Sequence, residues 1–422
     1  MERLATGTYC SALRSGYPPR FLTVADLFKN FSGRIQSPKR ATAIPSTRGQ
    51  NETNNASIDA AASQGEAAID QEFGSSRRPS HPRSDGTWHS SANLWRRFRK
   101  GVFAVMIVAL IALAGGMVYE SIGRMSDARR LPVRGRMVDI GGYRLNINCT
   151  GTGSPTVILD SGLGQPALSW KGVQAGVSQF TRVCSYDRAG YGQSDPGPQP
   201  RSSVQIAREL HALLERSQTP GPYVLVGHSF GGYNVRVYAG LYRKKVSGVV
   251  LVDASHEDQA QFQPASVREE ARGLRKLAPF VPLLRFFGVL RLRDRFQPAT
   301  VTGSKLSQAD MQEVSALALR PNFLPAVLQE YASLPTLSAN QVRSAGDLGD
   351  LPLMVLTAGQ GAGDKDLDGF RQAWLEKLQP SLARLSRRGQ QVVVQDSDHM
   401  IPYKDPEAIV RAIHSVWTGA LR

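Results

Sequence analysis

The residue types best suited to chemistry lie together in the pentapeptide Gly227-His228-Ser229-Phe230-Gly231, which reads G-x-S-x-G. It directly follows an apolar run, Tyr223 to Val226, and precedes a helix-compatible stretch, Gly232 to Tyr242. A strand, a tight turn and a helix in that order are the setting in which this pattern forms a nucleophile elbow. The glycines let the backbone turn sharply without a Cβ clash, and the turn exposes the serine hydroxyl. The pattern therefore predicts that Ser229 is a nucleophile.

Such a serine needs a base, because its hydroxyl reacts poorly until a neighbouring group takes the proton. His399 lies just beyond an apolar run, residues 391–395, and a position beyond a strand end gives the imidazole reach. His256, at the start of a long insertion, is the one rival. The other histidines fall in the N-terminal tail, in helix-like stretches or in the elbow: His81, His89, His211, His414 and His228. We predict that His399 is the base and later the acid that protonates the leaving group.

Eight short apolar runs predict the strands that would position these residues. They cover residues 136–140, 143–149, 155–160, 182–186, 223–226, 246–253, 353–357 and 391–395. Gly141-Gly142 separates the first two runs as a hairpin turn would, and helix-like stretches separate most of the others, clearest at residues 204–216. Strands that alternate with helices after an opening hairpin predict an α/β fold with an eight-stranded, mostly parallel sheet and helices on both faces.

The interval between Asp253 and Leu353 is too long for a loop and predicts an insertion of helices. Its apolar stretches are Leu274 to Phe296, Gln308 to Leu319 and Phe323 to Leu334. The insertion would stand above the carboxyl ends of the strands as a lid. We assign residues 256–350 to this helical lid, and residues 131–255 with 351–422 to the core domain.

Five landmarks, in this order, resemble the α/β-hydrolase fold superfamily over roughly residues 136–420. The stretch 160–164, Asp-Ser-Gly-Leu-Gly, stands where the family has its oxyanion loop, although many members have His-Gly where this chain has Ser-Gly. Residues 186–195, YDRAGYGQSD, resemble the family's YDRxGxGxSD turn. The elbow, the long insertion and the histidine segment at residues 397–402 complete the set.

The resemblance implies the remaining site residues. The backbone N–H groups of Leu163 and Phe230 would form the oxyanion hole. Most members place the triad acid after the seventh strand, where Asp364 comes late, whereas a minority place it after the sixth, where Asp253 stands at the strand tip. We favour Asp253 and keep Asp364 as the alternative. Asp187-Arg188 is expected to be a structural turn pair.

The expected activity is cleavage of carboxylic esters, with amides second, through an acyl-enzyme at Ser229. Dehalogenases and epoxide hydrolases resemble this scaffold but use aspartate at the elbow, so the serine disfavours both. The apolar lid favours a small-molecule ester with an apolar group. No cofactor and no metal is implied, because no phosphate loop, dinucleotide fingerprint or metal-ligand cluster is present in the sequence. The alternative is a non-catalytic relative that acts as a receptor or scaffold.

A membrane anchor is predicted at Gly101 to Tyr119, whose 19 uncharged residues are long enough to span a bilayer core as one helix. Residues 95–136 carry nine basic and two acidic residues of a chain with net charge +16. This concentration of charge beside the span argues against a nucleic-acid-binding face on the domain. The basic cluster before the span favours a cytoplasmic N-terminus. We therefore predict a single-pass protein, with a disordered tail (1–94), an anchor (95–130) and a periplasmic or extracellular catalytic domain.

Cys149 and Cys184 fall in the second and fourth predicted strands. The resemblance implies that these strands are neighbours, so the two side chains can meet near one edge of the sheet. We predict a disulfide that closes a loop of about 35 residues and stabilises the fold by about 3 kcal/mol. The bond needs an oxidising compartment, which the predicted topology supplies. Two unrelated buried thiols are the alternative.

Overall fold

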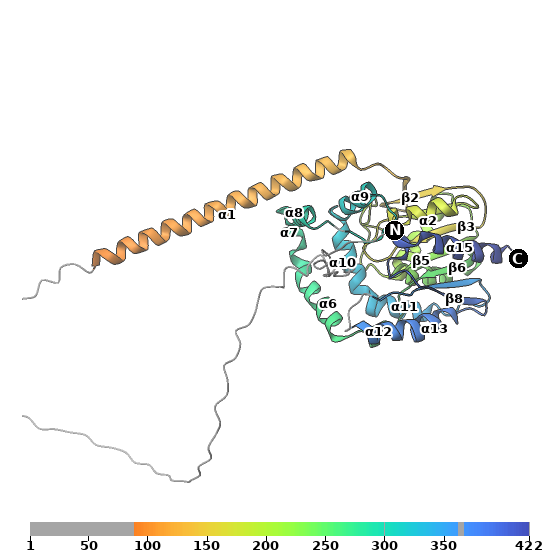
Figure 1. The fold of residues 1–422 in the computed structure, drawn as a ribbon. Helices are drawn as coiled ribbons and strands as arrows, with labels where there is room; N and C mark the ends of the chain where they lie inside the picture. Colours follow the sequence, from red (N-terminus) through yellow and green to blue (C-terminus); the bar gives the residue numbers. More distant parts are fainter. Residues whose placement is uncertain (1–87, 299, 362–366, 422) are drawn as a thin grey trace, which may run out of the picture. The chain divides into compact units, whose positions relative to one another are not determined.

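The computed structural model describes residues 88–298, 300–361 and 367–421. Its centre is one eight-stranded sheet in the order β1-β2-β4-β3-β5-β6-β7-β8 (Figure 1). The hairpin β1–β2 is antiparallel, β2 also pairs with β4 antiparallel, and all other pairs are parallel. The strands are β1 (Arg136–Asp139), β2 (Arg144–Thr150), β3 (Thr156–Asp160), β4 (Val183–Tyr186), β5 (Tyr223–His228), β6 (Val246–Val252), β7 (Leu353–Ala358) and β8 (Gly389–Val394). The predicted α/β-hydrolase sheet is confirmed, and every strand lies within a few residues of its predicted range.

Helices cover both faces of the sheet, which is why the central strands are apolar throughout rather than alternating. On one face, α3 (Ser203–Arg216) and α4 (Gly231–Leu241) pack on the side chains of the largest buried cluster. On the other face, α2 (Lys171–Val177) and α15 (Pro406–Ala420) enclose a second cluster around Trp170. Three short helices complete the C-terminal part: α12 (Asp368–Ala373), α13 (Gln379–Ala383) and α14 (Ile401–Lys404).

Seven α-helices lie between β6 and β7 in the described residues. They are α5 (Gln259–Phe262), α6 (Ala265–Leu277), α7 (Val281–Phe286), α8 (Val289–Phe296), α9 (Gln308–Ala318), α10 (Phe323–Ser333) and α11 (Ala339–Ser344). The apolar stretch 274–296 forms separate helices because Gly288 adopts φ 70° between α7 and α8. A left-handed residue ends an α-helix, and glycine adopts it at no steric cost. A third buried cluster joins these helices to Tyr191 and Leu163 of the core.

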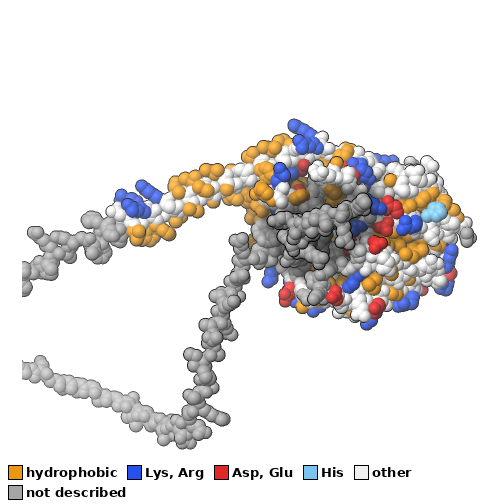
Figure 2. Space-filling view, in the orientation of Figure 1, with side chains coloured by type: hydrophobic (Ala, Val, Ile, Leu, Met, Phe, Trp, Pro, Cys, Tyr) orange, Lys and Arg blue, Asp and Glu red, His pale blue; other side chains and the backbone are white. Residues whose placement is uncertain are grey.

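The helix α1 (Trp88–Arg130) contains the predicted span. Within the part of the chain that the structure describes, its segment Asn93–Arg130 is the one helix long and apolar enough to cross a membrane, by length and composition, and its apolar window is unburied. Figure 2 shows hydrophobic side chains along α1 with basic side chains toward both of its ends. Two compact units divide the chain, one at residues 34–111 and the other containing residues 112–422. The tail predicted at residues 1–94 lies almost entirely outside the described residues.

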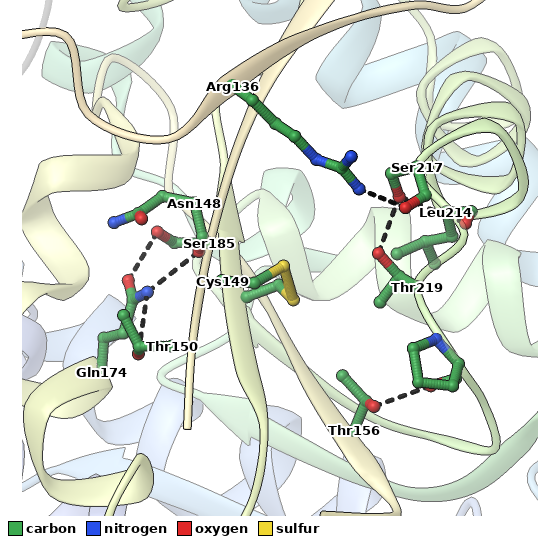
Figure 3. Close-up of a disulfide and its surroundings, with 12 residues drawn as sticks. Arg136, Asn148, Cys149, Thr150, Thr156, Gln174, Ser185, Leu214, Ser217 and Thr219 are labelled. Carbon is green, nitrogen blue, oxygen red and sulfur yellow. Dashed lines mark hydrogen bonds between the residues drawn. A yellow bond between two sulfur atoms is a disulfide. The ribbon is translucent and has the colours of Figure 1, made fainter. Parts of the chain in front are cut away.

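The predicted disulfide is present (Figure 3). Cys149 of β2 lies directly opposite Cys184 of β4 in the antiparallel register, and their sulfur atoms are bonded with Cα atoms 4.0 Å apart. The bond therefore fastens the β1–β2 hairpin to the rest of the sheet. Beside it, the side chain of Gln174 donates to the carbonyl oxygen of Asn148 and accepts from the hydroxyl of Ser185.

Candidate active site

The elbow forms where β5 ends at His228 and α4 begins at Gly231. Between them Ser229 has φ 52°, a left-handed conformation that is uncommon and strained for a residue with a side chain. A Cβ at Gly231 would collide with the carbonyl oxygen of Asp160 in β3, so this position must be glycine. The Ser229 N–H donates to the carbonyl oxygen of Val252 at 3.1 Å. These contacts place the partly exposed Ser229 at the carboxyl ends of β3, β5 and β6.

Two further predicted residues meet beside the elbow. Asp253 follows β6 directly, with φ 39°, and His399 lies in the turn after β8. Nδ1 of His399 is 2.6 Å from Oδ2 of Asp253. A carboxylate on Nδ1 holds the proton there and leaves Nε2 to act as the base. Asp364, the alternative acid, lies outside the described residues.

The carboxylate of Asp253 is held on both oxygens. Its Oδ1 accepts from Nε1 of Trp374 at 2.9 Å and from the Ala358 N–H at 3.0 Å. Burial would raise the pKa of Asp253, but the hydrogen bond and charge of His399, with these two donors, outweigh burial and lower the pKa to about 2. The group is therefore an anion at neutral pH, as an orienting acid must be.

His228, within the elbow, has a role that the sequence did not reveal. Its ring is buried, and its Nε2 donates to the carbonyl oxygen of His399 at 2.8 Å. Its Nδ1 lies 2.9 Å from the side-chain amide oxygen of Gln165. The two imidazole rings are 4.8 Å apart. Burial, assisted by the nearby His399, lowers the pKa of His228 to about 3, so the ring is neutral and its one N–H links the elbow to the turn that carries His399.

The rival base is engaged elsewhere. Nε2 of His256 is 2.7 Å from the Ser381 hydroxyl, and Nδ1 accepts from the Asp258 N–H at 3.0 Å. Nδ1 therefore stabilises the turn after β6, and Nε2 links that turn to α13. Burial lowers the pKa of this histidine from its ordinary value.

Arg188 holds the predicted oxyanion loop through two of its backbone carbonyl groups. Nη2 of Arg188 donates to the carbonyl oxygen of Gly162 at 3.0 Å, and Nη1 donates to the carbonyl oxygen of Ser161 at 2.5 Å. The Gly162–Leu163 peptide is trans, so its N–H points opposite to its C=O. The N–H of Leu163 therefore faces away from Arg188. Phe230 precedes the first residue of α4, where backbone N–H groups have no partner within the helix.

Arg188 itself lies in a fully buried ionic network. Its guanidinium contacts Oδ1 of Asp160 at 2.8 Å and Oε2 of Glu330 at 2.9 Å. The hydroxyl of Tyr191 donates to the same Glu330 oxygen at 2.6 Å and accepts from the Gly164 N–H at 3.1 Å. Because Glu330 belongs to α10, this network connects the insertion to the oxyanion loop.

Asp187 and Arg188, which we expected to be structural turn residues, both make structural contacts, but with different partners. Asp187 accepts from the backbone N–H groups of Ala167 and Gln193, whereas Arg188 turns to Asp160 and Glu330. Glu330 lies 142 residues farther along the chain, in a helix, and no local pattern marks it as a partner. Among residues 88–298, 300–361 and 367–421, no three His, Cys, Asp or Glu side chains gather as a metal site.

Comparison with known proteins agrees with this fold. The family model described as "Alpha/beta hydrolase family" matches residues 157–412, and the chain belongs to that family. The uncharacterized protein YqjL of Bacillus subtilis (strain 168) is 25% identical over 271 residues, covering 64% of this chain and 86% of that protein.

Solved structures share the fold. A thermophilic esterase from Thermogutta terrifontis is 22% identical, with a TM-score of 0.50 over 68% of this chain and 98% of that one. A putative epoxide hydrolase from Pseudomonas aeruginosa is 18% identical, with a TM-score of 0.52 over 68% of this chain and 97% of that one. The family and its neighbours support a hydrolase.

Proposed function

We propose that this chain is a membrane-anchored serine hydrolase that cleaves carboxylic esters through an acyl-enzyme on Ser229. The observation that carries the proposal is the 2.6 Å contact of Asp253 with His399, next to a strained serine elbow. Nucleophile, base and orienting acid in one place are the parts that acyl transfer requires. A serine at the elbow favours ester cleavage over epoxide opening.

The reaction follows from these positions. Oγ of Ser229 attacks the ester carbonyl carbon while Nε2 of His399 takes the hydroxyl proton. The tetrahedral oxyanion is stabilised by the N–H groups of Leu163 and Phe230. His399 then passes its proton to the departing alkoxide, which leaves as the alcohol. Water, deprotonated by the same histidine, attacks the acyl-enzyme. His399 returns that proton to Oγ of Ser229 as the bond to the acyl carbon breaks and the carboxylic acid leaves.

Arg188 supports stabilisation of the tetrahedral oxyanion without contacting the substrate. A cation hydrogen-bonded to the carbonyl of Gly162 fixes the orientation of the following N–H and polarises the peptide, so the N–H becomes a stronger donor. Preorganised donors stabilise a developing charge without reorganisation at the moment of reaction. Arg188 and Glu330 are therefore positioning residues.

An active-site-directed fluorophosphonate separates an enzyme from a non-catalytic scaffold. The probe phosphonylates an activated serine, so full-length protein in detergent should label, and Ser229→Ala should not. Ser255→Ala is a matched control, because this buried serine follows β6 by three residues and its N–H donates to the carbonyl oxygen of Ser229 at 2.9 Å. An unlabelled wild type, with folding verified by thermal melting, would favour the scaffold.

The anchoring is part of the proposal. The 19 uncharged residues at 101–119 and their basic flanks support a single span with the catalytic domain on the periplasmic or extracellular side. Full-length protein should remain with membranes after carbonate extraction. Recovery in the carbonate-soluble fraction would remove the anchor from the proposal while leaving the hydrolase intact.

A further inference from the structure

The end of α1 docks on the insertion through one stripe of residues, all within the same compact unit. Gly116, Glu120, Gly123 and Asp127 recur at spacings of four, three and four, which place them on one face of the helix. A Cβ at Gly116 would collide with the carbonyl oxygen of Phe287, between α7 and α8. The glycine thus lets the two backbones touch.

Ion pairs stabilise the same contact between α1 and the insertion. Glu120 is only 4% exposed, and its Oε2 accepts from Nε of Arg291 at 2.9 Å. Nη1 of Arg291 donates to Oδ2 of Asp127 at 2.8 Å, and Nη2 of Arg285 is 3.5 Å from Oε1 of Glu120. A buried carboxylate between two arginines fixes the position of α8 along the axis of α1.

This position along α1 coincides with the end of the apolar span. The span closes at Tyr119, and Gly116 lies three residues inside it, about 4.5 Å along the helix axis. The turn between α7 and α8 touches Gly116, so it lies level with the last turn of the span. A segment at that level lies at the boundary between hydrocarbon and headgroups.

The side chains at this level suit that boundary. Five large apolar side chains of the insertion are exposed by about half or more of their area; we call them the outer cap face: Phe280 (56%), Leu283 (53%), Phe286 (53%), Leu292 (49%) and Phe296 (77%). Residues 271–296 also contain seven basic residues and one acidic residue, and four of the basic side chains are exposed: Arg272, Arg275, Lys276 and Arg295. Exposed aromatic and aliphatic side chains among arginines are typical of helices that lie in a membrane interface.

The inner side of the same helices reaches the catalytic core. Val281 and Leu290 belong to the buried cluster that contains Val327 of α10, and Leu163 packs against that cluster. α7 and α8 thus lie between the outer cap face and the oxyanion loop.

We propose that the outer cap face lies in the interface of the bilayer that α1 crosses, with the exposed basic residues of the same segment at anionic headgroups. This inference rests on the proposed anchoring. It gives the insertion a fixed place against lipid and makes membrane-dissolved esters the substrate class that reaches the site. The occupant is the lipid surface, because the contact continues directly from the span.

Depth-dependent fluorescence quenching tests the placement in the full chain. Single cysteines are introduced at Phe286 on the outer cap face, at Leu110 in the span and at Val392, an exposed residue of β8, each in a Cys10→Ser background. The disulfide-bonded cysteines do not react with the label. The labelled proteins are reconstituted into phosphatidylcholine–phosphatidylglycerol vesicles that carry doxyl-labelled lipids, and aqueous iodide is the opposite quencher.

The probe at Phe286→Cys should be quenched by doxyl lipid to within about twofold of the probe at Leu110→Cys, while the probe at Val392→Cys should respond mainly to iodide. Quenching at Leu110→Cys without quenching at Phe286→Cys would overturn this inference and leave the anchor standing. Loss of quenching at Leu110→Cys would overturn the anchor and this inference together. Equal quenching of Phe286→Cys in vesicles of phosphatidylcholine alone would overturn the assignment of anionic lipid.

Discussion

Oδ2 of Asp253 lies 2.6 Å from Nδ1 of His399, although 146 residues separate the two along the chain. Both follow strands of the parallel sheet, β6 and β8, and carboxyl ends of parallel strands meet at one edge. If this pair orients the base, Asp253→Asn should lower kcat on the order of 10⁴-fold, because the amide holds the wrong tautomer of the ring. Steady-state kinetics on a nitrophenyl ester measures the loss.

Asp258→Asn is a matched control, because that carboxylate also follows β6 but lies nearer the surface and pairs with Arg343. It should retain kcat within about twofold, as for a surface substitution. Asp364→Asn tests the alternative acid. A deep loss of kcat in that variant, with activity preserved in Asp253→Asn, would transfer the role to Asp364.

The link between α10 and the oxyanion loop predicts that breaking it weakens stabilisation of the transition state but not binding of the substrate. Glu330→Gln removes the charge that holds Arg188 beneath the Gly162 carbonyl, so the N–H of Leu163 loses its fixed aim. We expect kcat to fall by about 10- to 100-fold with KM nearly unchanged, since that donor acts chiefly on the oxyanion.

Glu257→Gln provides the comparison, because Glu257 pairs with Arg236 away from the loop. It should lower the melting temperature without changing kcat. If Glu330→Gln changes only the melting temperature, or raises KM instead of lowering kcat, the network is a fold contact alone.

The depressed pKa of His228 makes stability depend on pH. The unfolded chain binds a proton on this imidazole below about pH 6.5, whereas the folded chain keeps it neutral down to about pH 3. Stability contributed by the neutral ring is thus complete above pH 6.5 and falls as the pH drops toward 3. The expected slope is about 1.4 kcal/mol per pH unit.

Unfolding of the detergent-solubilised chain at several pH values measures that slope. His228→Asn should be less stable at pH 7 and should show a flatter dependence between pH 6.5 and 4. His414→Asn, an exposed position on α15, should follow the wild type. Parallel curves for wild type and His228→Asn would refute the assignment.

The disulfide predicts an oxidised catalytic domain. Non-reduced peptide mapping of membrane-expressed protein should recover Cys149 joined to Cys184, and Cys149→Ser with Cys184→Ser should cost about 3 kcal/mol of stability. Free thiols at both positions in protein from an intact membrane would contradict the proposed topology, because the two residues lie opposite each other and would bond where the compartment allows.

The strands of the sheet could be predicted from local sequence patterns, whereas the helix boundaries of the insertion could not. The apolar runs of the sheet are short and separated by helix-compatible stretches, and the central ones are buried on both faces. The number and order of the strands can therefore be predicted without a structure. Gly288 shows the limit: a single left-handed residue divides an apolar stretch that periodicity alone leaves whole. The helix boundaries in the insertion follow from such backbone details.

The candidate site also contains residues that local sequence patterns predict and residues that they do not. Ser229 and His399 stand in local sequence patterns, and so they are predictable. Glu330, Trp374 and Glu120 are not, because each acts through a partner more than 100 residues away: Arg188, Asp253 and Arg291. Pairings at that distance depend on how the insertion packs on the core, which no spacing along the chain encodes.

Ester turnover by Ser229→Ala is the sharpest test of an acyl-enzyme at Ser229. Wild-type, Ser229→Ala and Ser255→Ala proteins are purified full-length and compared on nitrophenyl esters with acyl chains from acetyl to palmitoyl. Loss of the one hydroxyl should lower kcat/KM by about 10⁴-fold or more while the melting temperature stays near that of the wild type. Wild-type-like turnover by folded Ser229→Ala would contradict the account.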